Sequence, residues 1–240
     1  NKSYAMKNQQ QHRGRHQSDT ALFDAEALTH LRVALDELCW LLSRGYTETS
    51  ALKLVGDRHT LTKRQRMALR RSACTAEQLT LRLPKQCHSL AGETVCVDGF
   101  NCIITFEAML SAGPILRGRD GVRRDIASVH GSYRRVQETD AAIDAIAKLL
   151  QPAAAVTWFL DRPVSNSGKL AERIHTKAAL DALPWTVEVV NNPDRELAEF
   201  RDAIVATSDS WILDNAQRWV DLSSMFQPET LWLLDLCTPA

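Results

Sequence analysis

The sequence lacks the features that mark membrane, secreted and zinc-binding proteins. No apolar run approaches the roughly 18 residues that a transmembrane helix needs. Residues 1–18 are polar and basic and contain no apolar segment of the kind that a secretory signal requires, so we expect a cytoplasmic protein with no membrane partner. The six cysteines form no CxxC pair, and no histidines stand at zinc-finger spacing. We therefore expect reduced, mostly buried thiols.

Two catalytic motifs are missing as well. The chain has no GxxxxGK[ST] phosphate loop and no GxSxG turn, which argues against P-loop nucleotide hydrolysis and against serine catalysis. Neither sign of charge is in excess over the whole chain, but residues 1–92 carry 15 Lys and Arg against 8 Asp and Glu, whereas residues 93–240 carry 14 against 21. A basic part followed by an acidic part suits a polyanionic partner and bound cations, respectively.

The basic part reads as an arm followed by helices. Residues 1–18 contain almost no large apolar groups, and we expect them to be disordered. From 19 to 90, apolar residues recur at spacings of three and four between capping residues and glycines, which predicts a small all-α domain. Its third predicted helix is basic and opens with Lys63 and Arg64. That helix either contacts phosphates or forms a solvated face, and the sequence leaves both interpretations open.

Residues 91–240 have the pattern of an α/β domain. Apolar runs that predict strands lie at 94–97, 155–160, 186–190 and 204–206, and they alternate with predicted helices at 101–111, 136–150, 168–183, 194–202 and 209–220. Strands separated by helices of this length indicate βαβ units, so we expect a Rossmann-like parallel sheet flanked by helices. Residues 231–236 predict either a last strand or a buried helical turn.

Three of the predicted strands are followed by an aspartate, namely Asp98, Asp161 and Asp209. The carboxyl ends of neighbouring parallel strands meet at one edge of a sheet, so we expect these side chains to converge. A single aspartate after a strand is more often a helix cap, but converging carboxylates repel one another and favour a divalent cation. Oxygen ligands indicate Mg²⁺ or Mn²⁺ rather than zinc.

Nearby residues extend this predicted site. Asn101 lies three positions after Asp98, and Gly99 between them allows a tight turn at the strand end. Asp214 lies one and a half turns into the helix that follows Asp209, and Asp194, which caps its own helix after the third predicted strand, is a further candidate.

Two resemblances bear on this pattern. VDGFN around Asp98, an aspartate closing a second strand, and VATSD followed by a further acid together resemble the PIN-like nuclease superfamily, particularly its NYN branch, over residues 93–220. That likeness implies a Rossmann-like fold whose clustered aspartates bind Mg²⁺ or Mn²⁺ and cleave RNA. More closely, LCWLLSRGY, ALKLVGDRHTLTKRQR, SAGPILRGRDG, VHGSYR and PVSNSG resemble an uncharacterised prokaryotic family that joins domain-of-unknown-function families 434 and 5616.

Residues 113–135 are an insertion that minimal nucleases of the PIN-like type lack. Its guanidinium groups suit phosphate binding, although they could equally pair with the domain's excess carboxylates. The candidates for phosphate contact are Arg117, Arg119, Arg123, Arg124, Arg134 and Arg135. His130 is a candidate acid for the leaving oxygen, although a lone histidine is more often structural. The segment PVSNSGKL opens a helix and forms either an anion site or a capped turn from Ser165, Asn166, Ser167 and Lys169.

The sequence thus predicts metal-dependent phosphodiester hydrolysis. In this hypothesis Asp98, Asp161, Asp209 and Asp214 hold one or two ions that activate water, and Asn101 orients the water or a phosphate oxygen. RNA is favoured over DNA by the resemblance alone. Two alternatives stay open: a non-catalytic RNA- or nucleotide-binding protein on the same fold, and a phosphohydrolase acting on small phosphoesters. Whether the protein forms a homo-oligomer is also left open.

Overall fold

The N-terminal helices begin where the sequence supplies caps. A computed structural model describes residues 12–127 and 133–237. It contains α1 (Asp19–Leu22), α2 (Ala25–Ser43), α3 (Glu48–Arg58), α4 (Lys63–Ser72), α5 (Ala76–Arg82) and the 3₁₀ turn η1 (Leu83–Lys85). The side chains that cap α2 to α5 are those of Asp24, Thr47, Thr62 and Thr75. A glycine often marks the end of a helix, but Gly56 lies inside α3, which continues to Arg58. Gly56 packs against the Arg66 side chain.

The predicted parallel sheet is confirmed. Its five strands are β1 (Thr94–Asp98), β4 (Ala155–Asp161), β5 (Trp185–Val190), β6 (Ile204–Ala206) and β7 (Trp219–Val220), in the order β5-β4-β1-β6-β7. All four neighbouring pairs are parallel. The prediction of one helix over 209–220 was wrong, because α10 (Ser210–Asn215) ends at Asn215 and the chain returns to the sheet as β7.

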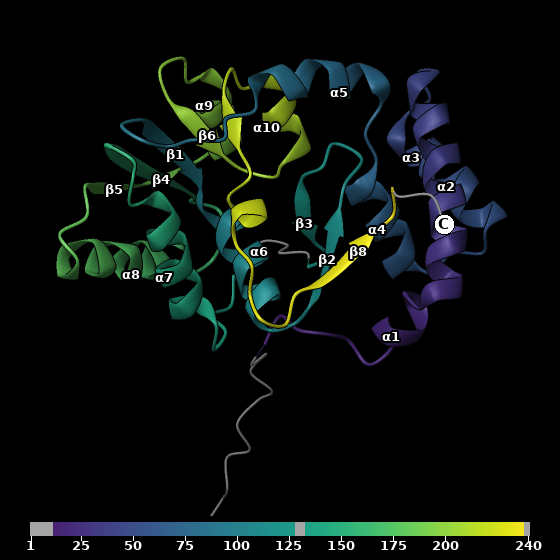
Figure 1. The fold of residues 1–240 in the computed structure, drawn as a ribbon, viewed down its shortest axis with the longest axis horizontal. Coiled ribbons are helices and arrows are strands. Elements are labelled where there is room, and N and C mark those ends of the chain that lie inside the picture. Colours follow the sequence, from purple (N-terminus) through teal and green to yellow (C-terminus); the bar gives the residue numbers. More distant parts are fainter. Residues whose placement is uncertain (1–11, 128–132, 238–240) are drawn as a thin grey trace, which may run out of the picture.

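Helices cover both faces of this sheet, as a Rossmann-like fold requires (Figure 1). On one face, α6 (Gly99–Leu110), α7 (Thr139–Leu150) and α8 (Ser167–Leu180) pack on Val97, Trp158 and Ile204. On the other face, α9 (Pro193–Glu199) and α10 pack on Phe159 and Val205. Side chains alternate between the two faces along each strand, so they contribute to two separate apolar layers.

A second, three-stranded sheet was not predicted. The insertion folds as an antiparallel hairpin of β2 (Pro114–Arg117) and β3 (Arg123–Asp125), and β8 (Trp232–Asp235) joins β2 in parallel after the 3₁₀ turn η2 (Leu222–Met225). Residues 231–236 thus do contain a strand, but in this sheet and not in the parallel one. The helices α2 to α4 share one apolar core with Leu116 of β2, Ile126 and Leu234 of β8. The helical region is therefore not a domain with a core of its own.

The segment before α1 differs from the disordered arm that the sequence suggests. Residues 1–11 lie outside the described part, but Arg13 is buried and its guanidinium group pairs with the buried Glu107 of α6. Arg15 lies over the Trp232 ring at 4.0 Å. Two arginines in a polar segment thus supply the attachment that the segment's few apolar groups cannot.

The expected cysteine chemistry holds. All six cysteines are free, and Cys39, Cys74, Cys96 and Cys102 are buried. None of the helices in the described part combines the length and the apolar character needed to cross a bilayer.

Candidate active site at the carboxyl edge of the parallel sheet

Three aspartates lie at the carboxyl ends of three adjacent strands. Asp98 ends β1 opposite Phe159 of β4, and Asp161 ends β4 two residues later. On the other side of β1, Val97 pairs with Ala206, the last residue of β6, and Asp209 follows after a two-residue link. The order β4-β1-β6 therefore places Asp98 between the other two at one edge of the sheet.

Asp98 is the most buried of the three, with 7% of its surface exposed. Its pKa is raised to about 7, mainly by burial and in addition by the charges of Asp209 and Asp194, against a hydrogen bond from Thr207 that lowers it. That bond runs from Thr207 Oγ1 to Asp98 Oδ2 at 2.8 Å. A carboxyl with this pKa is poised to lose its proton near neutral pH, in a place where a cation would favour the ionised form.

The link between β6 and α10 is held by the Asn101 side chain of α6 and by the link's own hydroxyl groups. Asn101 Oδ1 accepts hydrogen bonds from Ser208 N at 2.8 Å and Ser208 Oγ at 2.9 Å. Asp209 Oδ1 caps α10 by accepting from Trp211 N at 2.8 Å and Ile212 N at 3.1 Å. Asn101 therefore orients the loop that carries Asp209, and within the described residues its amide nitrogen donates no hydrogen bond.

Asp194 and Asp161 complete the acidic edge. Asp194 stands in the first turn of α9, which follows β5. Its pKa is raised by partial burial of the carboxyl group and by the charges of Asp209 and Asp161. Partial burial raises the pKa of Asp161. The charges of Asp209 and Asp194 act on Asp98, and those of Asp209 and Asp161 act on Asp194, so the four carboxylates form one electrostatically linked set.

Carboxylate oxygens are the ligands that hard divalent cations prefer. Among the residues that the structure describes, no three Asp, Glu, His or Cys side chains stand close enough to hold an ion together. Mg²⁺ is usually held by one or two carboxylates, its remaining positions being filled by water and substrate phosphate, so a magnesium site does not require three acidic side chains. The charges of neighbouring carboxylates raise the pKa values of Asp98 and Asp194, and a bound cation would relieve this repulsion.

Gly99 acts differently from the tight turn proposed for it. Its φ is not positive, and it is the first residue of α6. A Cβ there would lie 2.6 Å from Leu160 Cδ2 and 2.8 Å from the Phe159 carbonyl oxygen. Glycine is required because the start of α6 passes against β4, which brings Asn101 over the site.

Two predicted site residues belong elsewhere. The carboxylate of Asp214 faces α5, where Arg82 Nε donates to Oδ1 at 2.6 Å and Gln78 Nε2 to Oδ2 at 2.9 Å. Arg124 is buried and forms a two-bonded ion pair with Asp120. Because both charged groups are already paired inside the protein, we withdraw Asp214 as a metal ligand and Arg124 as a phosphate contact.

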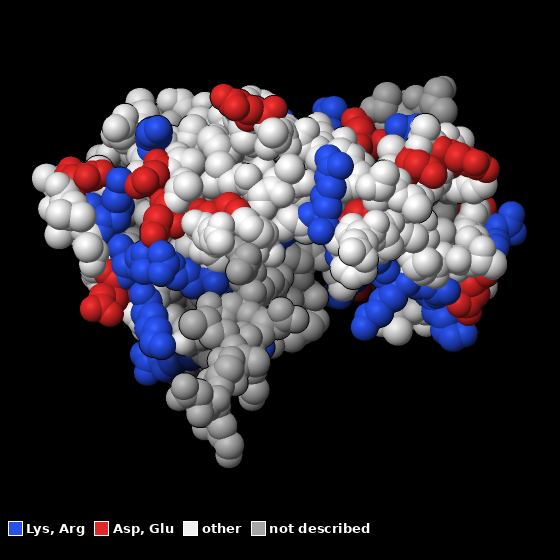
Figure 2. Space-filling model, turned by 90° about the horizontal axis from the view of Figure 1, so that it is seen from below, with Lys and Arg blue, Asp and Glu red and all other residues white. Residues whose placement is uncertain are grey.

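The remaining arginines of the insertion are scattered. Arg117 pairs with Asp235 at 3.3 Å, Arg123 donates to the carbonyls of Ser223 and Phe226, and Arg135 pairs with Asp140. Arg119 and Arg134 are exposed, and neither has an ion pair among the described residues. His130 lies outside the described residues. Figure 2 shows Lys and Arg mixed with Asp and Glu at both ends of the molecule, so on the face it shows they form no single basic surface.

The PVSNSG segment is a built turn at the start of α8. Asn166 has a left-handed φ of 72° and donates through Nδ2 to the Tyr133 carbonyl at 2.8 Å, while Ser165 O accepts from Tyr133 N at 3.3 Å. Ser167 is buried, and Ser165 and Asn166 are exposed. These contacts favour the capped turn over an anion site.

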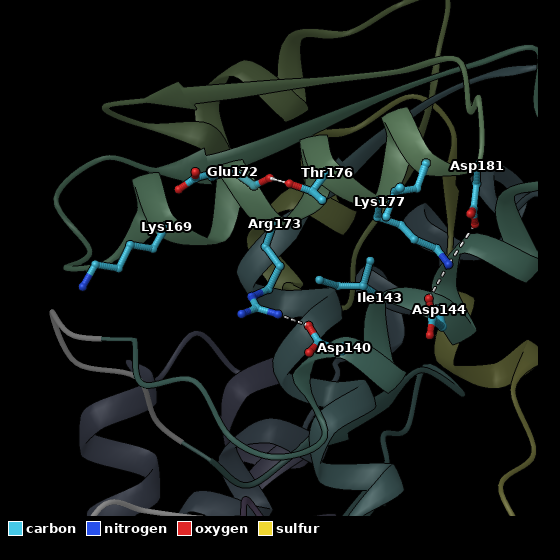
Figure 3. A pocket seen from close by; sticks show the side chains of 10 residues that line it. Asp140, Ile143, Asp144, Lys169, Glu172, Arg173, Thr176, Lys177 and Asp181 are labelled. Carbon is cyan, nitrogen blue, oxygen red and sulfur yellow. Dashed lines mark hydrogen bonds and ion pairs between the residues drawn. The ribbon is translucent and has the colours of Figure 1, made fainter.

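Lys169 lies at one end of a groove of about 450 Å³ between α7 and α8 (Figure 3). Along it, Arg173 pairs with Asp140, and Lys177 pairs with Asp144 and Asp181. Because these charges neutralise one another, the groove is a seam of ion pairs and not a catalytic pocket.

The basic helix α4 is largely paired as well. Arg64 forms an ion pair with the buried Asp19, Arg66 with Asp57 at 2.8 Å and Arg70 with Glu48 at 2.6 Å. Lys63 is exposed. Of the two interpretations of this helix, the contacts favour the structural one.

Sequence reasoning missed Arg82 and Asp221. Arg82 gives no signal, because its partners are remote in sequence. Asp221 follows β7 and is thus at the same carboxyl edge, but it accepts hydrogen bonds from Ser223 N, Ser223 Oγ and Arg123 N. It was missed because 209–220 was interpreted as one helix.

Comparison with known proteins gives a family but no activity. Residues 87–225 match the family described as "Domain of unknown function (DUF5616)", and residues 30–85 match "Protein of unknown function (DUF434)". A relative from Methanocaldococcus jannaschii, "Uncharacterized protein MJ0935", is 32% identical over 194 residues, which cover 79% of this chain and 92% of the relative. No solved structure matches the chain.

Proposed function

The chain belongs to the DUF5616 family, with a DUF434 segment ahead of that domain, and we propose that it is a metal-dependent nuclease of the PIN-like type, acting on RNA. The observation that supports this most is the linked set of Asp98, Asp161, Asp194 and Asp209 at one sheet edge, with the pKa of Asp98 raised to about 7. A buried acid with a raised pKa at the carboxyl ends of parallel strands is typical of a catalytic site.

Mg²⁺ or Mn²⁺ would be held by Asp98 and Asp209, with Asp161 and Asp194 within electrostatic range. When bound, such an ion supplies charge neutralisation at the phosphodiester and activation of water. Asp194 replaces Asp214 in this set because Asp214 is held by Arg82.

The protein's own groups orient the reactants. Thr207 fixes one oxygen of Asp98, and Asn101 keeps its amide nitrogen available for a phosphate oxygen or a water. Arg119, Arg134 and Lys169 are exposed and have no ion pair among the described residues, which makes them the best candidates for contacts with phosphates. The choice of RNA over DNA depends on the resemblance to the NYN branch.

Cleavage of a labelled RNA pool tests this proposal. We expect cleavage with Mg²⁺ or Mn²⁺, none with a chelator, and a loss of about 100-fold or more in Asp98→Asn, which keeps the shape of the side chain but removes its charge. Asp144→Asn is the control, since Asp144 lies in the seam between α7 and α8. Wild-type protein that cleaves no RNA under any of these conditions contradicts the proposal.

One observation favours a second function, a non-catalytic RNA- or nucleotide-binding protein. It is the lack, among the described residues, of three acidic, His or Cys side chains at metal-holding distance. Metal-independent RNA binding by wild type and Asp98→Asn alike, without cleavage, would select this function. A parallel panel of nucleotides and chromogenic phosphoesters tests the phosphohydrolase alternative.

A further inference from the structure

Arg82 connects the helical region to the proposed site. It is the last residue of α5 and is fully buried. Its Nε donates to Asp214 Oδ1 at 2.6 Å, its Nη1 donates to Asp120 Oδ2, and its Nη2 donates to the carbonyl oxygen of Ser210 at 3.1 Å. One side chain from α5 thus bonds to α10, to the β2–β3 turn and to the residue directly after Asp209.

Arg124 of β3 approaches the same loop from the hairpin. Its Nη1 and Nη2 donate to the two carboxylate oxygens of Asp120 at 2.8 and 2.7 Å. Its Nε donates to the carbonyl oxygen of Ser208 at 2.7 Å, directly before Asp209. The backbone carbonyls on both sides of Asp209 are therefore held by buried guanidinium groups, and Asp120 joins the two.

The network is balanced in charge, since Arg82 and Arg124 face Asp120 and Asp214. A buried ion network is weak evidence for stability, because desolvation cancels much of the attraction between its members. The rigid fork of a guanidinium group does fix geometry, and three of its donors here have separate acceptors. What the network secures is the path of the 208–210 backbone, and that path sets where the Asp209 carboxylate lies.

We propose that Arg82 and Arg124 are positioning residues for Asp209, and that the edge site is complete only when the helical region, through α5, is docked on the hairpin and α10. This inference deepens the proposed function and rests on it where catalysis is concerned. It also gives a physical reason for the two family segments to occur in one chain: the match at 30–85 contains Arg82, and the match at 87–225 contains Asp209.

Hydrogen exchange of the full-length protein tests the positioning without any activity. Asp209 accepts the amide hydrogens of Trp211 and Ile212, so a displaced loop exposes them. In Arg82→Lys and in Arg124→Lys we expect these two amides to exchange about tenfold faster, because lysine lacks the fork that reaches the loop carbonyls. Arg13→Lys is the control: it alters another buried ion pair, with Glu107 on the opposite end of α6, and should leave exchange at 207–213 unchanged.

Cleavage kinetics give the catalytic readout. At saturating RNA and Mn²⁺ we expect kcat to fall about 10- to 100-fold in both loop variants, with KM changed by about twofold or less, as is usual when groups behind a metal ligand are altered. Arg13→Lys should keep the wild-type kcat. Arg124→Lys leaves the Arg82–Asp214 contact in place and serves if Arg82→Lys does not fold.

Positioning of the loop and nuclease activity can fail independently of each other. Folded loop variants with wild-type exchange at Trp211 and Ile212 and wild-type kcat would overturn the positioning role. Faster exchange in a protein whose wild type cleaves no RNA would support the positioning of the loop while contradicting the nuclease.

Discussion

At the scale of single residues, the main electrostatic feature of the site is the raised pKa of Asp98. In the unfolded chain the Asp98 carboxyl loses its proton near its ordinary pKa of 3.8, whereas in the folded protein burial raises that pKa to about 7. The folded state therefore binds the proton more tightly, and the resulting stabilisation is complete below about pH 4 and is lost as the pH rises through about 7. Above that pH, an ionised Asp98 without a cation opposes folding.

This gives a pH-dependent prediction for Asp98→Asn in the presence of a chelator. At pH 8 the variant should be more stable than wild type by on the order of 4 kcal/mol, because it has no buried charge to desolvate. Near pH 4 the difference should disappear, since both side chains are neutral there. Urea unfolding of both proteins at pH 4 and pH 8 measures this difference in the free energy of unfolding.

The matched comparison is Asp144→Asn, whose acid lies at the surface in an ion pair. It should show no gain at pH 8. A constant offset between wild type and Asp98→Asn from pH 4 to pH 8 would contradict the raised pKa, and with it the main support for a site at Asp98.

At the scale of elements, the junction of β1 with α6 sets the geometry of the site. The strand delivers Asp98, the helix begins at once with Gly99, and its first turn presents Asn101 to Ser208. This junction works only because Gly99 lets the helix start against β4. The sequence identified the aspartate and the asparagine, but attributed the glycine to a turn, because a close approach to Phe159 and Leu160 is a contact over some sixty positions.

Gly99→Ala should therefore destabilise the protein by about 1–3 kcal/mol, because its Cβ would collide with the backbone oxygen of Phe159, which cannot rotate away. Gly168→Ala is the control. That glycine is also near the start of a helix, and a Cβ there meets nothing within 4 Å. We expect Gly168→Ala to be neutral or slightly stabilising. Equal unfolding midpoints in urea for the two variants would contradict this account of the junction.

At the scale of the whole molecule, the helical region and the α/β part are joined by packing and by charge. The helices α2 to α4 bury Leu116 and Leu234 of the second sheet, and Arg82 reaches the loop of Asp209. The sequence indicates a boundary near residue 90, and the two family matches meet there. The boundary is one of sequence, since the apolar core of the helices includes residues from both sides of it.

One cooperative unfolding transition follows from this shared core. Leu234→Ala in β8 should cost about 2–5 kcal/mol and should lower the melting temperature of the helices and of the parallel sheet together. Leu233→Ala, at the adjacent and 36% exposed position, should change stability by about 0.5 kcal/mol or less. Thermal unfolding of each variant is followed by circular dichroism at a helical wavelength and by tryptophan fluorescence. Separate transitions for the two signals would show independent domains.

The sequence by itself determined the parallel sheet and the gathering of Asp98, Asp161 and Asp209 at its carboxyl edge. Both depend on short-range patterns, apolar runs of strand length and helices between them, together with the rule that crossovers bring successive strand ends to one edge. Only the tertiary structure decided which charges are free. Asp214 and its partner Arg82 are 132 positions apart in the sequence. Arg124 and Ser208, whose carbonyl oxygen it binds, are 84 positions apart. Such partners cannot be predicted from a local sequence pattern, because an ion pair depends on where the helices and strands pack and not on their order along the chain.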